Sequence, residues 1–170
     1  IERYPPTVTG DGIHTISELI DEENQIRKSM QLHPCIYPIS KNEQTISFLK
    51  KSNYTLESIP AKDEDVILFY RISLAPGGTV RTIDKNSIPE VNKQLFLDVL
   101  DMFDANILGI DVIFEKGIEH SYQEQKCIFL EVNSRPYLKM HDYPRYGEKE
   151  DLSPYFDKLD QLDIKNADTF

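Results

Sequence analysis

Two carboxylates near the middle of the chain could hold a metal ion. Asp111 lies within an apolar, β-branched run at 107–114, and Glu131 lies near the end of a second such run at 127–132. An unpaired charge among apolar neighbours is costly to bury, so both acids should have a compensating partner. A cation between them would supply it, and a solvated face on an edge hairpin is the alternative.

The turn between these runs decides whether the two acids meet. A polar segment with Gly117 separates the runs, which is typical of a β-hairpin. The symmetric placement of Glu115 and Cys127 centres the turn near Ser121. In that register the two carboxylates face each other directly, and opposed like charges repel unless a cation lies between them.

A third oxygen donor shares this face of the predicted hairpin. Because side chains alternate along a strand, Asn133 lies on the same side as Glu131, and Val132 points away. Carboxylate and amide oxygens are hard donors that suit Mg²⁺. The pattern therefore predicts a magnesium site formed by Asp111, Glu131 and Asn133.

The elements that must position these residues predict an α+β fold. Thr15 and Glu18 form a capping box ahead of an amphipathic helix that should end near Lys28. Apolar residues at helical spacing predict a core helix at 88–103. Further helices are expected at 43–51 and after Asp151 to about residue 162, and strands at 65–70, 107–114 and 126–133. Hairpin-linked strands make the expected sheet mainly antiparallel, flanked by helices within one domain.

Composition excludes several classes of partner. The 170 residues are 39% apolar, which suffices for one domain with a real core. Nineteen Lys and Arg stand against 29 Asp and Glu, for a formal charge of −10. This acidic balance argues against nucleic acid or an anionic membrane as the main partner.

Two further features indicate a soluble cytoplasmic protein. No apolar run approaches the roughly 20 residues that span a bilayer, and the first residues do not have the pattern of a signal peptide. Cys35 and Cys127 are too few for a disulfide framework, so they are expected to be reduced thiols.

A glycine-containing segment after the 65–70 strand could lie against phosphates. Gly77 and Gly78 would let the backbone come close to a bound group, and Arg71, Ser73 and Arg81 supply donors. A Pro-Gly-Gly turn that only connects two strands is the alternative.

Beyond the hairpin, the segment SRPYLKMHDYPRYGEK is basic in an otherwise acidic chain. It contains Arg135, Lys139, His141, Arg145 and Lys149. Such a segment would suit a carboxylate or phosphate substrate, and a solvated basic loop is the alternative.

Five short motifs together resemble a known family. They are GDG-x-x-TI at 10–16, PGG at 76–78, GID at 109–111, EVN at 131–133 and MH-x-YP at 140–144. In this order they resemble the carboxyl-terminal part of ATP-grasp ligases, in the branch of cyanophycin synthetase and the ATP-grasp domain of bifunctional glutathione synthetase. The resemblance covers nearly the whole chain. It implies the carboxyl-terminal lobe of an ATP-grasp fold at 1–160, followed by a polar tail at 161–170.

The resemblance also implies a reaction and its cofactors. In this family a substrate carboxylate attacks the γ-phosphate of ATP, and an amine displaces phosphate from the acyl phosphate to form an amide. The family's metal residues correspond to Asp111, Glu131 and Asn133, which would hold Mg²⁺ at the ATP phosphates. Leu130, before Glu131, would face the adenine.

The catalytic arginine is less directly matched. The family typically has an arginine where this chain has Phe69, and asparagine and serine-threonine where it has Ser73 and Ala75–Pro76. Arg71 is therefore a displaced candidate for stabilising the developing charge, and Ser73, Gly77 and Gly78 are candidates for nucleotide contact.

Substrate contacts are expected in the basic segment. Tyr137 stands where many relatives have glycine, so the segment departs from the family there. The candidate contacts with a small carboxylate and amine, an amino acid or a peptide, are Arg135, Tyr137, His141 and Arg145.

The family's other parts have no counterpart in this sequence. The amino-terminal substrate domain and the lobe whose lysines cover ATP are missing, and the chain begins without methionine, so a piece of a longer polypeptide is expected. By itself it should lack ligase activity. The alternative is a nucleotide- or metal-binding module, or an interaction domain, that has lost catalysis.

Overall fold

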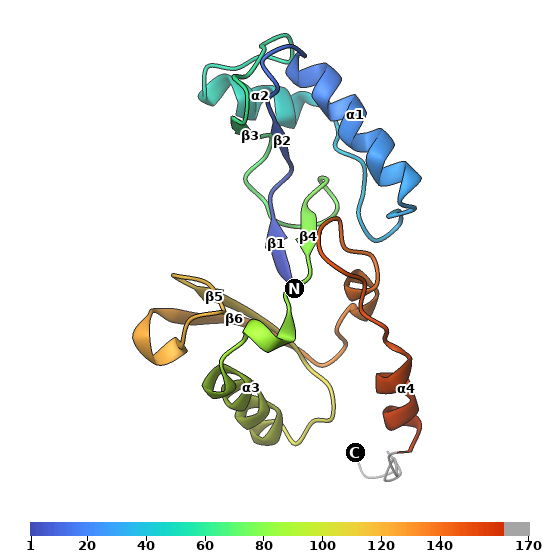
Figure 1. Cartoon of the computed structure of the whole chain (residues 1–170), viewed down its shortest axis with the longest axis vertical. Helices are drawn as coiled ribbons and strands as arrows, with labels where there is room; N and C mark the ends of the chain where they lie inside the picture. The colour runs from blue at the N-terminus through green and yellow to red at the C-terminus, as the bar shows by residue number, and fades with distance from the viewer. Residues whose placement is uncertain (162–170) are drawn as a thin grey trace. The chain divides into compact units, whose positions relative to one another are not determined.

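A computed structural model describes residues 1–161 as an α+β fold (Figure 1). The strands are β1 (Glu2–Tyr4), β2 (Thr7–Thr9), β3 (Asp65–Ile67), β4 (Thr79–Arg81), β5 (Gly109–Phe114) and β6 (Cys127–Asn133). The helices are α1 (Ile16–Ser29), α2 (Glu43–Lys51), α3 (Glu90–Met102) and α4 (Ser153–Asp160), with short 3₁₀ helices η1 (Lys85–Ser87), η2 (Tyr122–Glu124) and η3 (Leu138–His141). The α+β class is confirmed, and the antiparallel pairing is divided among the small sheets β1–β4, β2–β3 and β5–β6. Residues 162–170 of the predicted polar tail lie outside the described residues.

The chain divides into two compact units. The first unit comprises Ile1–Thr82 and Lys139–Glu150. The second, here called the hairpin unit, comprises residues 83–138 and the described residues from Asp151 to 161. The lobe expected at 1–160 stays a prediction, and each unit is described by itself.

The first unit is built around α1 and a closed apolar core. The predicted capping box is present, because Glu18 donates its backbone N–H to the Thr15 hydroxyl at 3.2 Å and accepts from the Thr15 N–H at 2.8 Å. Asn42 caps α2 by accepting from the backbone N–H groups of Gln44 and Thr45 at 3.0 and 3.1 Å, and α2 has the predicted bounds. The buried sides of both helices share one apolar core with the strands β2 and β3. Fully or nearly fully buried members of this core are Val8, Ile16, Leu19, Ile20, Ile39, Leu49, Val66 and Leu68.

The strand predicted at 65–70 is shorter than expected. It pairs with β2 only over Asp65–Ile67, and Leu68 then donates its N–H to the carbonyl of Pro6 at 2.8 Å. Pro5 and Pro6 have no N–H, so they cannot continue the ladder on the partner side. The chain therefore leaves the sheet before Phe69.

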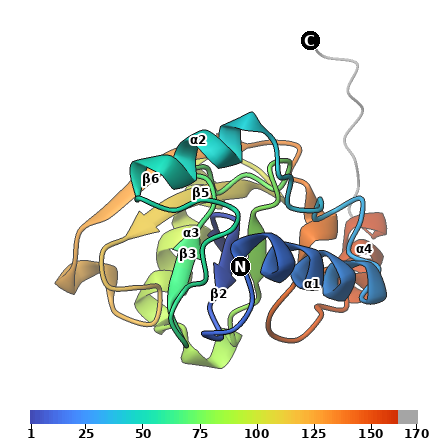
Figure 2. The same ribbon diagram turned by 90° about the horizontal axis from the view of Figure 1, so that it is seen from above.

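In the hairpin unit, α3 packs against one side of the β5–β6 hairpin. Phe96 of α3 meets Phe114 of β5 edge to face, with ring centroids 6.4 Å apart. The fully buried Asn92 donates to the carbonyls of Ile118 and His120 at 2.7 and 2.9 Å, and accepts from the N–H of Tyr122 at 2.8 Å. These bonds tie the hairpin's connecting loop to the helix, and Figures 1 and 2 both place α3 beside the hairpin.

Two helices of the hairpin unit begin later than predicted. The 88–103 helix starts at Glu90, because Ile88 precedes Pro89 and is extended, a position where helical backbone is disfavoured. The helix expected after Asp151 begins at Ser153 and ends at Asp160. Within the described part of the chain, no helix combines the length and apolar character needed to cross a membrane.

Candidate functional site

The hairpin brings the two predicted metal carboxylates into direct opposition. Asp111 pairs with Glu131, and Gly109 pairs with Asn133. The predicted pairing of the acids, and their position on one face, are confirmed. Gly109 contributes by having no side chain, since a Cβ there would lie 2.9 Å from Cβ of Pro136 and 3.5 Å from Cβ of Asn133. The strand end that carries the asparagine is therefore left uncrowded.

The register differs from the prediction on the turn side of the acids. A β-bulge between Asp111 and Val112 shifts the pairing by one residue, so Cys127 pairs with Phe114 and not with Glu115. The symmetric turn predicted around Ser121 is wrong for this half. The bulge inserts an extra residue, Leu130, into β6 immediately before Glu131. Such insertions are frequent beside active sites, where they redirect side chains.

The bulge decides which apolar side chains share the carboxylate face. Phe114 meets α3 through Phe96, so alternation places Asp111 and Ile113 on the face away from α3. With the bulge, the partner of Ile113 is Ile128, whereas the predicted register would have put Phe129 there. Ile113 and Ile128 are 51% and 54% exposed. The carboxylates therefore lie next to an open apolar pair.

The three oxygen donors are accessible. Asp111 and Asn133 are half-buried and Glu131 is exposed, so the apolar residues beside Glu131 in the sequence do not enclose it. Among residues 1–161, no cluster of three or more His, Cys, Asp or Glu side chains could hold a metal alone. Two carboxylates with an amide fit Mg²⁺, which usually keeps several waters and binds through one or two carboxylates plus substrate phosphates.

The predicted nucleotide glycines are buried in the first unit. Gly77 has φ +94°, and a Cβ on it would lie 2.9 Å from Cα of Ile39. A Cβ on Gly78 would lie 2.4 Å from the carbonyl oxygen of Ser73. Both glycines thus let the protein's own backbone pack closely, which supports the turn alternative. Their contact with a nucleotide stays a prediction.

The other candidates of this loop are exposed. Arg71 donates through Nε to the Tyr70 hydroxyl at 3.2 Å, and its guanidinium lies 5.7 Å from the centroid of that ring. Ser73 is exposed, and its carbonyl accepts from the Gly78 N–H at 3.2 Å. The catalytic role of Arg71 and the nucleotide role of Ser73 stay predictions.

The cationic side chains of the basic segment differ in the groups they contact. Arg145 makes two bonds to Glu23, from Nε at 2.9 Å and from Nη2 at 2.8 Å. This bidentate pair holds the guanidinium in place and raises the pKa of Arg145. Lys139 and Lys149 each lie 5.2 Å from the ring centroid of Tyr143.

The remaining substrate candidates are accessible to different degrees. Arg135 and Tyr137 are exposed and belong to the hairpin unit, and His141 is half-buried in the first unit. The substrate roles of Arg135, Tyr137, His141 and Arg145 stay predictions. The guanidinium of Arg145 is already engaged by the Glu23 carboxylate.

Residues with structural roles near these loops were not apparent from sequence pattern. Glu23 and Arg27 form a buried ion pair on α1, and Asn24 binds Ile39 through both the N–H and the carbonyl. The available signal was the i, i+4 spacing of Glu23 and Arg27, which is also common on exposed helix faces. Cys35 and Cys127 are thiols, as expected, and burial raises the pKa of Cys127.

Comparison with known proteins finds relatives that cover most of this chain. The glutathione biosynthesis bifunctional protein of Listeria monocytogenes is 30% identical over 155 residues, which is 89% of this chain and 19% of that protein. Cyanophycin synthetase of Synechocystis is 34% identical over 160 residues, 93% of this chain and 18% of that protein. The chain resembles ATP-grasp ligases. No family model matches it.

A solved structure gives the same result for the fold. The bifunctional glutathione synthetase of Pasteurella multocida superposes with a TM-score of 0.77 at 26% identity, over 92% of this chain and 21% of that one. The chain thus spans about a fifth of the length of the ATP-grasp relatives it matches. The resemblance extends over most of the chain, as the five motifs indicated.

Proposed function

We propose that this chain is the ATP- and Mg²⁺-binding part of an ATP-dependent carboxylate–amine ligase. The observation that carries the proposal is the direct pairing of Asp111 with Glu131, with Asn133 on the same face of β6. Opposed carboxylates on an accessible sheet face repel each other, and a divalent cation removes that repulsion. The names of the relatives, glutathione synthetase and cyanophycin synthetase, supply the class of reaction.

In this proposal the hairpin residues hold the ion and orient the nucleotide. Asp111 and Glu131 provide carboxylate oxygens, Asn133 provides an amide oxygen, and the exposed Leu130 offers an apolar contact to the adenine. Bound Mg²⁺ would neutralise charge on the ATP phosphates. The side chains of Arg71 and Ser73 are exposed and would donate to phosphate oxygens.

The complete reaction requires parts beyond this chain. A carboxylate substrate would attack the γ-phosphate, and an amine would then displace phosphate from the acyl phosphate to form an amide. The substrates would be an amino acid or a peptide, met by the basic segment. The amino-terminal lobe of the same polypeptide would supply the lysines that cover ATP. The isolated chain is therefore expected to be inactive.

Titration of the isolated chain with Mg-ATP tests the proposal. Because few contacts are available without the other lobe, we expect a Kd of roughly 1 mM, a free energy near −4 kcal/mol. The variant Glu131→Gln should weaken this binding by about tenfold or more, because it removes one charge from the ion's ligands. Glu119→Gln, which removes an exposed carboxylate from the hairpin's connecting loop, is the matched control and should bind as the wild type does.

Two results would contradict this interpretation. Equal binding by the wild type and Glu131→Gln would show that the paired acids hold no metal. Micromolar binding of Mg-ATP would show that the nucleotide site is complete within these residues and needs no second lobe.

A module without catalysis is the second candidate, and one observation favours it. Gly77 and Gly78 are buried against the protein's own backbone, which leaves them little room to contact phosphates. The sequence flanking this chain in its gene discriminates the two candidates. An adjoining lobe with the ATP-covering lysines supports the ligase, and a gene without one supports the module.

A further inference from the structure

Arg27 is a buried arginine on α1 that binds three other parts of the first unit. It is 3% exposed. Its Nε donates to Glu23 at 2.8 Å, its Nη1 donates to the carbonyls of Tyr37 and Gly77 at 2.8 Å each, and its Nη2 donates to the Thr79 hydroxyl at 3.0 Å. A guanidinium presents its donors in a rigid planar fork, so these bonds fix the distances between the segments they join.

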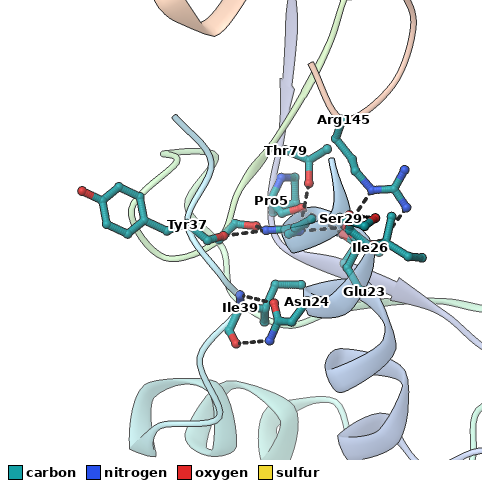
Figure 3. A network of polar contacts seen from close by, with 12 residues as sticks. Pro5, Glu23, Asn24, Ile26, Ser29, Tyr37, Ile39, Thr79 and Arg145 are labelled. Atoms are coloured by element: carbon teal, nitrogen blue, oxygen red, sulfur yellow. Dashed lines mark hydrogen bonds and ion pairs between the residues drawn. The ribbon is translucent and has the colours of Figure 1, made fainter. Parts of the chain in front are cut away.

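Glu23 completes the network by accepting from two arginines. It binds Nε of Arg27 and both Nε and Nη2 of Arg145, as Figure 3 shows for Glu23 and Arg145. Burial raises the pKa of Glu23, but the bonds from Arg145 and Arg27 outweigh it and hold the pKa below its ordinary value. The carboxylate is therefore charged, and the buried guanidinium has a permanent counter-ion.

A second contact from α1 holds the wall against which the glycine turn packs. Asn24 donates to the carbonyl of Ile39 at 2.9 Å and accepts from its N–H at 2.7 Å (Figure 3). Ile39 is the residue that a Cβ on Gly77 would strike. Arg27 thus binds the turn through the Gly77 carbonyl, and Ile39, which Asn24 of α1 binds, packs against the same turn.

The loop that this network anchors has a buried base and an exposed end. Its base closes on itself, because Gly77 donates its N–H to Leu74 at 3.0 Å and Gly78 donates to Ser73 at 3.2 Å. Its exposed end bears Arg71 and Ser73. Any movement at the base would therefore move the two side chains proposed to contact phosphate.

We propose that Arg27 is a positioning residue that fixes the 71–78 loop for nucleotide binding. The proposal rests on the function proposed above and assigns Arg27 no contact with the ligand. Arg27 acts through the Gly77 carbonyl and the Thr79 hydroxyl, which set the base of the loop. Its partner Glu23 keeps the guanidinium oriented, and Arg145 serves this structure through Glu23.

Amide hydrogen exchange and two titrations test the proposal on the full chain. Arg27→Lys keeps the positive charge next to Glu23 but cannot reach Tyr37, Gly77 and Thr79 together. We expect exchange over residues 70–79 to rise about tenfold, with residues 54–64 unchanged. Mg-ATP binding, followed by NMR shifts, should weaken about fivefold, whereas Mn²⁺ binding at the hairpin carboxylates should stay as in the wild type. The control Asp21→Asn removes an exposed α1 ion pair to Lys41 and should change none of these.

The outcomes separate this proposal from the proposed function. Unchanged exchange over 70–79, or equal acceleration throughout the first unit, would overturn the positioning role. Equal weakening of Mg-ATP and Mn²⁺ binding would also overturn it, because general loss of structure would affect both. If the wild type binds no Mg-ATP, the proposed function fails while the exchange data still decide whether Arg27 holds the loop. Should Arg27→Lys not fold, Thr79→Val removes a single acceptor, leaves the Glu23 pair intact, and should raise exchange over 70–79 alone.

Discussion

The two units of this protein differ in how their apolar side chains are used. In the first unit, Ile16, Ile20, Leu49 and Leu68 are fully enclosed, and a buried ion network ties α1 to the surrounding loops. In the described part of the hairpin unit, Val99 and Asn92 are the buried residues, while Ile113, Ile128 and Leu130 are more than half exposed. The candidate metal carboxylates are in the unit with the smaller core. Their geometry is therefore maintained by backbone pairing and by the bonds of Asn92 more than by packing.

Core truncation gives the largest expected contrast between the units. Leu49→Ala should lower the free energy of unfolding by about 2–5 kcal/mol, because it removes buried methylenes and leaves a cavity. Leu130→Ala, at a side chain that is 59% exposed, should change it by no more than about 0.5 kcal/mol. Urea unfolding followed by circular dichroism measures both. A large effect of Leu130→Ala would mean that another surface covers the hairpin in solution.

The metal carboxylate should show the reverse pattern in the complete enzyme. Glu131→Gln preserves shape and removes a charge from the metal's ligands, so phosphate release from ATP should fall about a hundredfold or more. The melting temperature should be unchanged, because Glu131 is exposed. If activity survives this change at normal magnesium concentration, Glu131 is a structural residue. The proposed contrast between a structural core in the first unit and functional carboxylates in the hairpin unit would then be wrong.

Asn92 tests whether polar bonds substitute for a core in the hairpin unit. Asn92→Ala leaves the carbonyls of Ile118 and His120 without their buried donor, which should cost about 1–3 kcal/mol. Exchange of the amides in β5 and β6 should rise, and those of α1 should not. Gln94→Ala, at an exposed position on the same helix, is the control. If Asn92→Ala exchanges like the wild type, packing of Phe96 on Phe114 is sufficient to order the hairpin.

Acid should weaken the first unit through Glu23, with the smallest effect of the four. The pKa of Glu23 is lowered in the folded protein, so its stabilising contribution is present above the pKa of an unfolded glutamate, about 4.3, and is lost as pH falls through the lower folded value. Glu23→Gln lacks this contribution. The stability difference between wild type and variant should therefore be constant from neutral pH to about pH 5 and shrink below about pH 4. A difference independent of pH would show that Glu23 acts only through its shape.

Several features followed from local sequence. The capping box of Thr15 and Glu18 and the bounds of α2 were predicted because helix ends depend on residues a few positions apart. The pairing of Asp111 with Glu131 was predicted because a hairpin's turn sets its register over a short span. The three proposed metal donors thus required no tertiary information.

Other features were decided only by tertiary structure. The bulge at Leu130 reverses which apolar residues share the carboxylate face, and no local pattern announces a single inserted residue. Glu131 is exposed although its neighbours in sequence are apolar, because the hairpin is covered by α3 on one face only. In the sequence, Arg145 does not differ from the other cations of the basic segment, and its pairing with Glu23 depends on the fold. Gly77 suggests a ligand-binding loop in the sequence, but in the structure it packs against Ile39. The contacts of Arg145 with Glu23 and of Gly77 with Ile39 join residues far apart in the chain, so they depend on the whole fold, whereas helix capping depends on neighbouring residues.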